Sequence, residues 1–451
     1  MELELIKRVY FVGIGGIGMS AIARYFKKRG CLVSGYDKTQ TVLTAALEKE
    51  GIAIAYKDEV AFVPAEFLNN DAETLIVYTP AIPKNSVILN YFMDSGFDLK
   101  KRSQVLGIIS KGQFCIGVAG THGKTTTSSI IAHLLTDTGY GCTAFLGGIA
   151  TNYKSNFLIG DNDVVVVEAD EYDRSFLTLH PDIAVITSMD ADHLDIYGDA
   201  EQLHESFQLF ADQLEEGGTL FIKKGLPIQD GTTYSAGLDS VVRAQNIRVE
   251  DSNFVFDYKD EVHAIDNIRL MLPGKHNVEN ATVAIAVALK LGIDADKIKA
   301  SVASFLGVKR RFEYVVKAEN HIYIDDYAHH PEELRACFDA VRQLYPDKKL
   351  SVIFQPHLFT RTRDFADGFA EVLSAVDELL LLEIYPAREL PIEGINAQFL
   401  ADKITLGNCS VLTKEEVLQH IKSTGPELLL TVGAGDIDTL IEPLKDILSN
   451  A

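Results

Sequence analysis

Two glycine-rich stretches in this chain have the residue types and spacing of phosphate-binding loops. Residues 13–20 read GIGGIGMS, and residues 117–127 read GVAGTHGKTTT. Glycine allows backbone N–H groups to approach a phosphate closely, and a helix that starts directly after the loop favours the negative charge. The sequence therefore predicts that the chain binds two different phosphorylated ligands.

The first loop has the pattern G-x-G-x-x-G, formed by Gly13, Gly15 and Gly18. It follows the strand-like run RVYFV and precedes a helix-like run, which is the setting that this pattern needs. Asp37 ends the next strand-like run, where dinucleotide-binding folds place an acidic group against a ribose hydroxyl. These features favour diphosphate binding over a plain strand-to-helix turn, and they do not specify a nicotinamide cofactor.

The second loop departs from the strict pattern G-x-x-x-x-G-K-[ST]. Five residues separate Gly117 from Gly123, and Val118 stands at the expected glycine position. The loop still lies between an apolar strand-like run and a helix-like run. It supplies Lys124 for the terminal phosphates of a nucleotide and the Thr125 hydroxyl for Mg²⁺. We therefore expect this loop to bind a nucleoside triphosphate.

Acidic residues that could hold a metal ion follow two later strand-like runs. DVVVVEAD ends with Glu168 and Asp170, and the next run leads into MDADHLD, which contains His193. Carboxylate oxygens suit Mg²⁺, so Glu168 is the stronger candidate ligand. His193, taken alone, is better explained as a loop histidine that hydrogen-bonds to its neighbours.

The elements that must position these residues alternate along the chain as strands and helices. Unbroken apolar runs such as DVVVVEAD and DIAVITSMD are typical of parallel strands buried on both faces. This alternation restarts twice, and a chain of 451 residues is long enough for about three domains. We predict an α/β fold with three domains, at residues 1–107, 108–307 and 308–451.

Composition excludes several classes of protein. A net charge of −22 argues against nucleic acid as a partner. Five scattered cysteines without C-x-x-C spacing indicate neither a disulfide framework nor a zinc site. No apolar run is long enough for a membrane span and the start does not read as a signal peptide, so we expect a cytoplasmic protein. The oligomeric state stays open.

Taken together, a set of motifs spanning nearly the whole chain resembles the Mur ligases of peptidoglycan precursor synthesis. In chain order these motifs are GIGGIGMS, AGTHGKTTT, EADEYDRSFL, DADHLDIYG, LPGKHNVENA, KRRFE, DDYAHHP, QPHLFTRTRD and VGAGDI. The resemblance implies a Rossmann-like UDP-binding domain, a central P-loop ATPase domain and a Rossmann-like C-terminal domain that binds an amino acid.

The resemblance also implies a reaction and its cofactors, ATP and Mg²⁺. The lactyl carboxylate of UDP-N-acetylmuramate attacks the γ-phosphate of ATP, and the amine of L-alanine then displaces phosphate from the acyl phosphate. The first loop ends in Met-Ser, and a later segment reads HLD. Both features favour the family member that attaches L-alanine over a recycling ligase that attaches a tripeptide. A P-loop switch ATPase and a nicotinamide-dependent enzyme are alternatives from other classes, and each leaves one glycine loop unexplained.

Site residues carried over from the family fall into four groups. The UDP-sugar group is Gly13, Gly15, Gly16, Gly18, Asp37 and Thr79. The ATP group is Gly120, Thr121, His122, Gly123, Lys124, Thr125, Thr126, Asn277, Asn280, Arg311 and Asp326. The metal ligands are Thr125, Glu168 and His193, and the catalytic group is Lys124, Glu168, His193, Arg311 and Asp326. The alanine group is His329, His330, His357 and Arg361, with helix capping beside Pro331 as the alternative for His330.

Three departures from the family pattern bear on substrate contacts. Leu358 stands where relatives often carry arginine, so one anionic contact is either absent or supplied by Arg363. Tyr172 stands where serine is common, and the segment TPAIP around Thr79 and Pro80 replaces a more usual serine pair. The amino acid is therefore less firmly predicted than the reaction.

Overall fold

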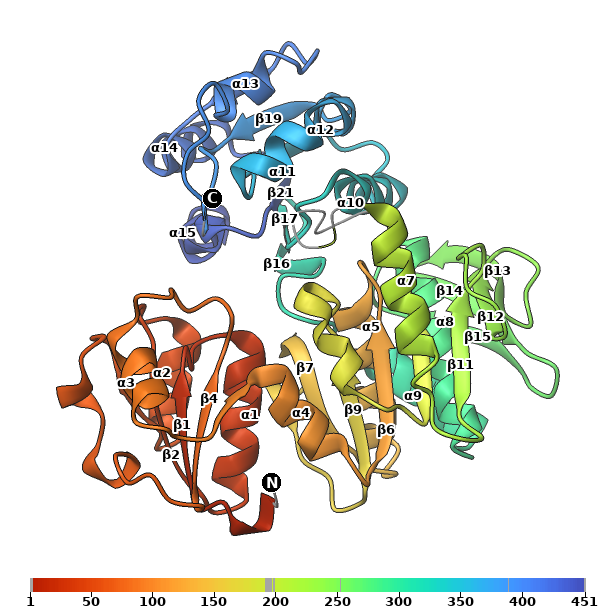
Figure 1. Cartoon of the computed structure of the whole chain (residues 1–451). Coiled ribbons are helices and arrows are strands. Elements are labelled where there is room, and N and C mark those ends of the chain that lie inside the picture. Colours follow the sequence, from red (N-terminus) through yellow and green to blue (C-terminus); the bar gives the residue numbers. More distant parts are fainter. Residues whose placement is uncertain (1–2, 191–196, 198, 252, 388, 450–451) are drawn as a thin grey trace. The chain divides into compact units, whose positions relative to one another are not determined.

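The computed structural model describes residues 3–190, 197, 199–251, 253–387 and 389–449. The chain divides into two compact units, and Figure 1 labels their helices and strands. The first unit comprises Met1–Ile247, Phe256–Arg269 and Glu279–Leu306, and the second comprises Arg248–Val255, Leu270–Val278 and Gly307–Ala451. The chain forms three sheets covered by helices, which confirms the predicted α/β class. The predicted boundaries of the three domains stay predictions.

The N-terminal sheet is parallel and has the strand order β3-β2-β1-β4-β5. Its strands are β1 (Arg8–Val12), β2 (Leu32–Tyr36), β3 (Ala53–Ala55), β4 (Thr74–Tyr78) and β5 (Leu99–Lys101), and its helices are α1 (Ile17–Lys28), α2 (Val42–Lys49) and α3 (Val87–Asp94). Val12 pairs with Tyr36 in register, so the loops after β1 and β2 leave the sheet at the same edge.

A ten-stranded sheet follows, with the order β15-β14-β13-β12-β11-β10-β6-β9-β7-β8. Its strands are β6 (Phe114–Ala119), β7 (Thr143–Ala150), β8 (Ser155–Leu158), β9 (Val164–Glu168), β10 (Ile183–Ile186), β11 (Thr219–Lys223), β12 (Thr232–Ala236), β13 (Val242–Glu250), β14 (Asn253–Lys259) and β15 (Ala264–Leu270). The helices of this region are α5 (Lys124–Asp137), α7 (Ala200–Ala211), α8 (Lys275–Lys290) and α9 (Ala295–Ser304). Val118 at the end of β6 pairs with Glu168 at the end of β9.

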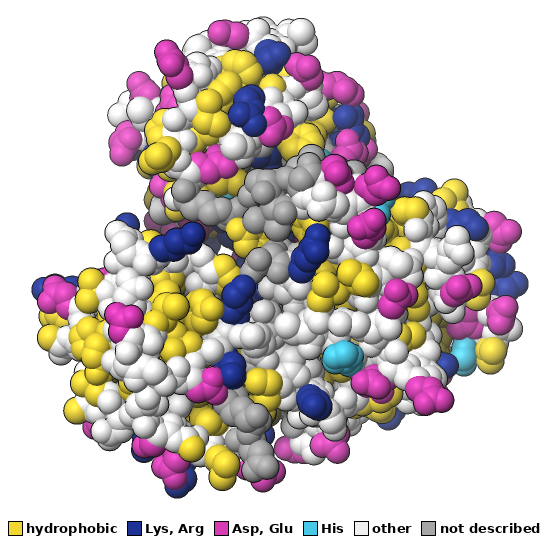
Figure 2. Space-filling view, in the orientation of Figure 1, with side chains coloured by type: hydrophobic (Ala, Val, Ile, Leu, Met, Phe, Trp, Pro, Cys, Tyr) yellow, Lys and Arg dark blue, Asp and Glu magenta, His cyan; other side chains and the backbone are white. Residues whose placement is uncertain are grey.

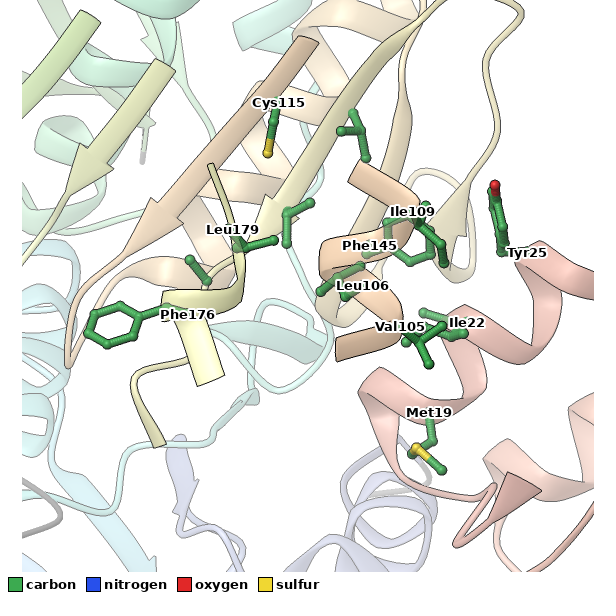
Figure 3. Packing of buried hydrophobic residues seen from close by; sticks show 14 of the residues in the cluster. Met19, Ile22, Tyr25, Val105, Leu106, Ile109, Cys115, Phe145, Phe176 and Leu179 are labelled. Carbon is green, nitrogen blue, oxygen red and sulfur yellow. The ribbon is translucent and has the colours of Figure 1, made fainter. Parts of the chain in front are cut away.

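Helix α4 (Arg102–Ser110) joins the N-terminal sheet to the ten-stranded sheet through a shared hydrophobic core. Its Val105, Leu106 and Ile109 side chains belong to the same buried cluster as Ile22 of α1 and Phe176 of the short helix η4 (Tyr172–Thr178), as Figure 3 shows. Because one core spans both sheets, residues on α1 and residues after β9 are held in a fixed relation within the first unit.

The second unit contains a six-stranded sheet with the order β16-β17-β21-β18-β19-β20. Its strands are β16 (Glu313–Lys317), β17 (Ile322–Asp326), β18 (Leu350–Phe354), β19 (Glu378–Leu381), β20 (Cys409–Val411) and β21 (Leu428–Val432). Its helices are α10 (Pro331–Leu344), α11 (Phe359–Asp364), α12 (Ala366–Leu373), α13 (Ala397–Ala401), α14 (Lys414–Thr424) and α15 (Ile441–Ser449). Only β16 pairs antiparallel, and buried clusters cover both faces of this sheet.

Among the described residues, no helix combines the length and the apolar character needed to cross a membrane. Figure 2 shows Asp and Glu side chains spread among basic and hydrophobic ones over the visible face. This distribution fits general surface acidity as the source of the net charge of −22.

The core shared by α1 and α4 gives a test of stability. Ile109 is 2% exposed in that core, whereas Ile159 is 53% exposed. We expect Ile109→Ala to lower the free energy of unfolding by about 2–5 kcal/mol, because truncation removes buried methylene groups and leaves a cavity. Ile159→Ala, the matched control, should change it by less than about 1 kcal/mol. Urea denaturation followed by circular dichroism measures both, and equal effects would contradict the assigned core.

Candidate functional site

The first glycine loop is fastened to the end of β2. The Gly13 and Ile14 amides donate to the Tyr36 carbonyl at 2.8 and 3.0 Å, and the Gly15 amide donates to Oδ2 of Asp37 at 2.8 Å. A Cβ atom on Gly15 would lie 2.7 Å from the same carboxylate oxygen, so glycine is required there. Asp37, predicted to face a ribose, here holds the loop in place.

Other residues predicted for the UDP-sugar lie around the same loop. A Cβ atom on Gly13 would lie 2.9 Å from the Thr79 methyl group, so Thr79 borders the loop. Gly16 is the N-cap residue of α1 and offers no side chain to the first amides of that helix. The backbone there is suited to accept an anion.

The second glycine loop wraps the start of α5 and packs against the residues that follow β10. A Cβ atom on Gly120 would lie 2.1 Å from the Thr187 hydroxyl oxygen, and one on Gly123 would lie 3.0 Å from Oδ1 of Asn280. The His122 amide and the Thr121 hydroxyl bond to the Ser188 hydroxyl at 2.6 and 2.9 Å. The structure therefore brings the loop and Asn280 together, and their role in ATP binding stays a prediction.

Thr187 and Ser188 are residues of this site that sequence reasoning missed. They lie in the predicted strand DIAVITSMD, directly after its apolar part. Since β10 runs parallel beside β6, its end must lie next to the loop after β6. The position of two hydroxyl residues at the end of a neighbouring strand was the available signal.

The two predicted metal ligands among the described residues lie side by side. The Thr125 hydroxyl donates to Oε1 of Glu168 at 3.0 Å, and the Gly147 amide donates to Oε2 at 2.9 Å. A hydroxyl and a carboxylate in contact form an all-oxygen donor set that suits Mg²⁺. No cluster of three His, Cys, Asp or Glu residues suited to a metal occurs in the described part of the chain. His193 lies outside the described residues.

Lys124, the first residue of α5, forms a buried ion pair with Glu171. Its Nζ atom lies 2.7 Å from Oε2 of Glu171, and it also donates to the Gly120 carbonyl at 2.5 Å. The exposed fractions of the two side chains are 13% and 1%. Burial lowers the pKa of Lys124, but the carboxylates of Glu171, Asp170 and Glu168 together raise it above its usual value. The sequence placed Glu171 near the site without assigning this role.

Asn277, the other asparagine predicted to contact the nucleotide, lies in the first turn of α8. It is 5% exposed, and its side-chain amide donates to the Pro273 carbonyl at 2.7 Å. This bond fixes the turn that precedes α8.

Asp326 ends β17 and pins the turn that carries Arg311. Its carboxylate accepts hydrogen bonds from the Phe312 and Ala328 amides, both at 2.7 Å. Burial raises the pKa of Asp326 to about 6, although the nearby Arg311 guanidinium acts to lower it. Arg311 and Asp326 thus lie close together, and their roles toward ATP stay predictions.

Two adjacent arginines in this turn have different environments. Arg310 donates to the buried Asp325 carboxylate at 3.0 Å, while the Arg311 side chain is 30% exposed. Both guanidinium groups lie over the Tyr327 ring, at 5.2 and 5.1 Å from its centroid. Tyr327 was not predicted as a site residue, and its place between Asp326 and His329 was the only signal.

Two of the four residues predicted for alanine binding lie close together. The rings of His329 and His357 are 5.9 Å apart, and the His357 ring stacks on Tyr385 at 5.8 Å. His330 instead packs against Phe365 and caps α10 by accepting from the Glu332 amide at 3.4 Å. The capping alternative considered for His330 therefore describes its contacts.

Arg361 lies on α11. Leu358, one of the departures from the family pattern, directly precedes this helix. Arg361 is 7% exposed. Leu358 is 7% exposed and has a φ of +71°, a left-handed conformation that is costly for leucine. Arg363 is half exposed and donates to the neighbouring Asp364 at 2.6 Å. Tyr385, which bonds through its backbone to Pro356 and Leu358, was missed because it lies in an irregular segment far along the chain.

Fold and site together define a three-sheet α/β protein with two glycine-rich loops, each followed by a helix, and with acidic side chains beside the second loop. Three models of Mur ligase domains match the chain: the catalytic domain at residues 8–114, the middle domain at 118–288 and the glutamate ligase domain at 310–435. The chain belongs to the Mur ligase family.

Curated relatives match along the whole chain. The UDP-N-acetylmuramate–L-alanine ligase of Flavobacterium johnsoniae is 51% identical over 449 residues, covering 100% of this chain and 99% of the relative. The ligase of the same name from Cytophaga hutchinsonii is 50% identical and covers 99% and 97%. The family predicted from the motifs is thereby confirmed.

Solved structures show the same fold. A UDP-N-acetylmuramate–alanine ligase from Thermotoga maritima is 26% identical with a TM-score of 0.82, covering 98% of each chain. A murein peptide ligase from Psychrobacter arcticus is 23% identical with a TM-score of 0.72 and covers 99% of each chain. At that identity, the second likeness concerns the fold alone.

The raised pKa of Asp326 predicts a pH dependence of stability. The pKa is 3.8 for an ordinary aspartate and about 6 here. The protonated Asp326 carboxyl contributes to the free energy of unfolding. This contribution is fully present below about pH 4 and is lost as the pH rises through about 6, because the buried carboxyl must then ionise. Relative to Asp326→Asn, the wild type should lose about 2–3 kcal/mol of unfolding free energy over that range.

Urea denaturation at several pH values measures this difference. Asp367→Asn is the matched control, since the Asp367 side chain is 94% exposed. If the difference in unfolding free energy between the wild type and Asp326→Asn stays constant between pH 4 and pH 7, the raised pKa of Asp326 is contradicted.

Proposed function

We propose that this chain joins L-alanine to the lactyl carboxylate of UDP-N-acetylmuramate and converts ATP to ADP and phosphate. The observation that carries this proposal is the sequence identity of 50–51%, over the full length, to relatives named UDP-N-acetylmuramate–L-alanine ligase. A recycling ligase that adds a tripeptide has weaker support, because the murein peptide ligase is similar only at 23% identity. Membership of the Mur ligase family excludes the switch ATPase and the nicotinamide-dependent enzyme.

In the proposed reaction the two glycine loops have separate ligands. The loop at Gly13, Gly15, Gly16 and Gly18, with Asp37 and Thr79, binds the UDP-sugar, and the loop at residues 120–126, with Asn277 and Asn280, binds ATP. A carboxylate that attacks a polyphosphate meets electrostatic repulsion. Lys124 and the N-terminus of α5 reduce this repulsion by placing positive charge at the γ-phosphate. The attack gives an acyl phosphate, from which the alanine amine displaces phosphate.

Mg²⁺ belongs to this proposal, with Thr125, Glu168 and His193 as its ligands. Thr125 and Glu168 support it, because their oxygens are in contact beside the loop that binds ATP. A bound Mg²⁺ supplies positive charge that polarises the phosphate oxygens.

The second unit carries the remaining residues of the proposal. Arg311 and Asp326 belong to ATP recognition, and His329, His330, His357 and Arg361 belong to alanine binding, where a guanidinium can pair with the alanine carboxylate. The three proposed domains, at residues 1–107, 108–307 and 308–451, then divide the work among UDP-sugar, ATP and amino acid. A cytoplasmic location is part of the same proposal.

Phosphate release from ATP tests the function directly. We expect release to require UDP-N-acetylmuramate and L-alanine together with Mg²⁺, and mass spectrometry to find UDP-N-acetylmuramoyl-alanine as the product. Chelation of Mg²⁺ by EDTA should abolish release, and added Mg²⁺ should restore it. Release that depends on the tripeptide in place of alanine would support the recycling ligase, and release that needs no UDP-sugar would overturn the proposal.

The buried ion pair decides how the role of Lys124 is tested. Lys124→Ala alone leaves the Glu171 carboxylate buried without its cation, which destabilises a protein by about 3–5 kcal/mol. Lys124→Met combined with Glu171→Gln removes both charges. We expect this double variant to fold, to bind UDP-N-acetylmuramate as the wild type does and to lose ligation by more than about 100-fold, since the phosphates lose their cation.

Calorimetry for UDP-sugar binding and the phosphate assay measure the two effects. Glu171→Gln alone is the matched control and should keep most of the activity. Comparable loss of UDP-sugar affinity and of activity in the double variant would contradict the division between the two loops.

A further inference from the structure

Arg102 is a residue without an assigned role that contacts the first glycine loop and the acidic segment after β9. It is the first residue of α4, and its Nη2 atom donates to Oδ2 of Asp170 at 2.9 Å. Asp170 lies two residues after Glu168, the candidate metal ligand at the end of β9. Arg102 thus connects the N-terminal sheet to the acidic segment beside the second loop.

The other side of the Arg102 guanidinium lies against the first loop. A Cβ atom on Gly18 would lie 2.7 Å from Nη1 of Arg102 and 3.0 Å from its Cδ. The third glycine of G-x-G-x-x-G is therefore needed here because any side chain would displace Arg102. This places a permanent positive charge at the first turn of α1, where the diphosphate of the UDP-sugar is proposed to bind.

Neighbouring contacts fix this position of Arg102. The Thr178 hydroxyl donates to the Ser103 carbonyl at 2.9 Å, and a Cβ atom on Gly107 would lie 2.5 Å from the Thr178 carbonyl. Asp170 is held in turn by accepting from the Tyr172 amide at 3.1 Å. Helix α4 is thereby packed tightly on η4, and the guanidinium is preorganised.

Stability alone does not explain the Arg102–Asp170 pair. The two side chains are 20% and 36% exposed, and ion pairs with such solvent access contribute little to folding. Arg102, Asp170 and Glu168 also line a gap of about 10 Å³ between α4 and η4, which has room for one water molecule at most. The phosphate would therefore meet Arg102 at the first turn of α1, where its guanidinium N–H donors are suited to bidentate recognition.

We propose that Arg102 binds the sugar-linked phosphate of the UDP-sugar diphosphate and that Asp170 positions it. This inference rests on the proposed function and names a further residue for substrate binding. The substrate must extend from the first loop to the γ-phosphate at the second loop, and Arg102 contacts the first loop and the acidic segment that holds Glu168 and Asp170. Asp170 keeps the guanidinium directed at the first turn of α1 when the substrate is absent.

Competition binding with UDP-N-acetylmuramate, UDP and UMP tests this role. UMP lacks the second phosphate, so Arg102→Ala should weaken binding of UDP-N-acetylmuramate and of UDP by about 10- to 100-fold, and should leave UMP binding unchanged. ATP binding measured without the UDP-sugar should stay within about twofold of the wild type. Arg102→Lys, which keeps the charge without the planar fork, should restore part of the lost affinity.

Arg29→Ala is the matched control, since Arg29 lies at the opposite end of α1 and bonds to Tyr25. It removes the same charge and should leave all affinities unchanged. Equal losses for UDP and UMP, or an unchanged UDP affinity in Arg102→Ala with an unchanged melting temperature, would overturn the proposal. A wild-type protein that binds no UDP-sugar would instead overturn the proposed function itself.

Discussion

The site depends on how the acidic segment at the carboxyl end of β9 is neutralised. Glu168 bonds to the Thr125 hydroxyl, Asp170 pairs with Arg102, and Glu171 pairs with Lys124. Each acid in this short segment has a different partner, and these partners come from α4 and from the second glycine loop. Glu171 is the most buried of these acids, at 1% exposed, so the loss of its Lys124 partner would leave a carboxylate without a cation in a region of low polarity.

Parallel pairing explains why distant residues meet at this edge. β6 lies between β9 and β10, and all three run in the same direction. The loop after β6, the acids after β9 and the hydroxyls after β10 must therefore leave the sheet together. The N-terminal sheet repeats the arrangement, because the loop after β1 and Asp37 after β2 leave it at one edge. A strand order with neighbouring parallel strands is enough to assemble both sites.

Features that are local in sequence could be predicted, and features that depend on long-range packing could not. The glycine loops, the Thr125–Glu168 pair and the α/β class follow from strand-loop-helix patterns that the sequence displays. Arg310 and Arg311 are identical in type, yet only Arg310 reaches Asp325. That difference arises from a local left-handed backbone, with φ of +61° at Arg310, and from the pairing of β17 with β21, neither of which the residue types reveal.

Charge balance at the second loop gives a physical reason for the proposed requirement for Mg²⁺. The carboxylates of Glu171, Asp170 and Glu168 all act on Lys124, the one P-loop lysine, and raise its pKa. Lys124 is already paired with a carboxylate that is 1% exposed. A triphosphate bound at this loop, as proposed, would bring several further negative charges to the same place, and one shared lysine would not offset them. The Mg²⁺ proposed to bind beside Thr125 and Glu168 would supply the missing positive charge without leaving Glu171 unpaired, so the buried ion pair would link the stability of the loop to the proposed need for Mg²⁺.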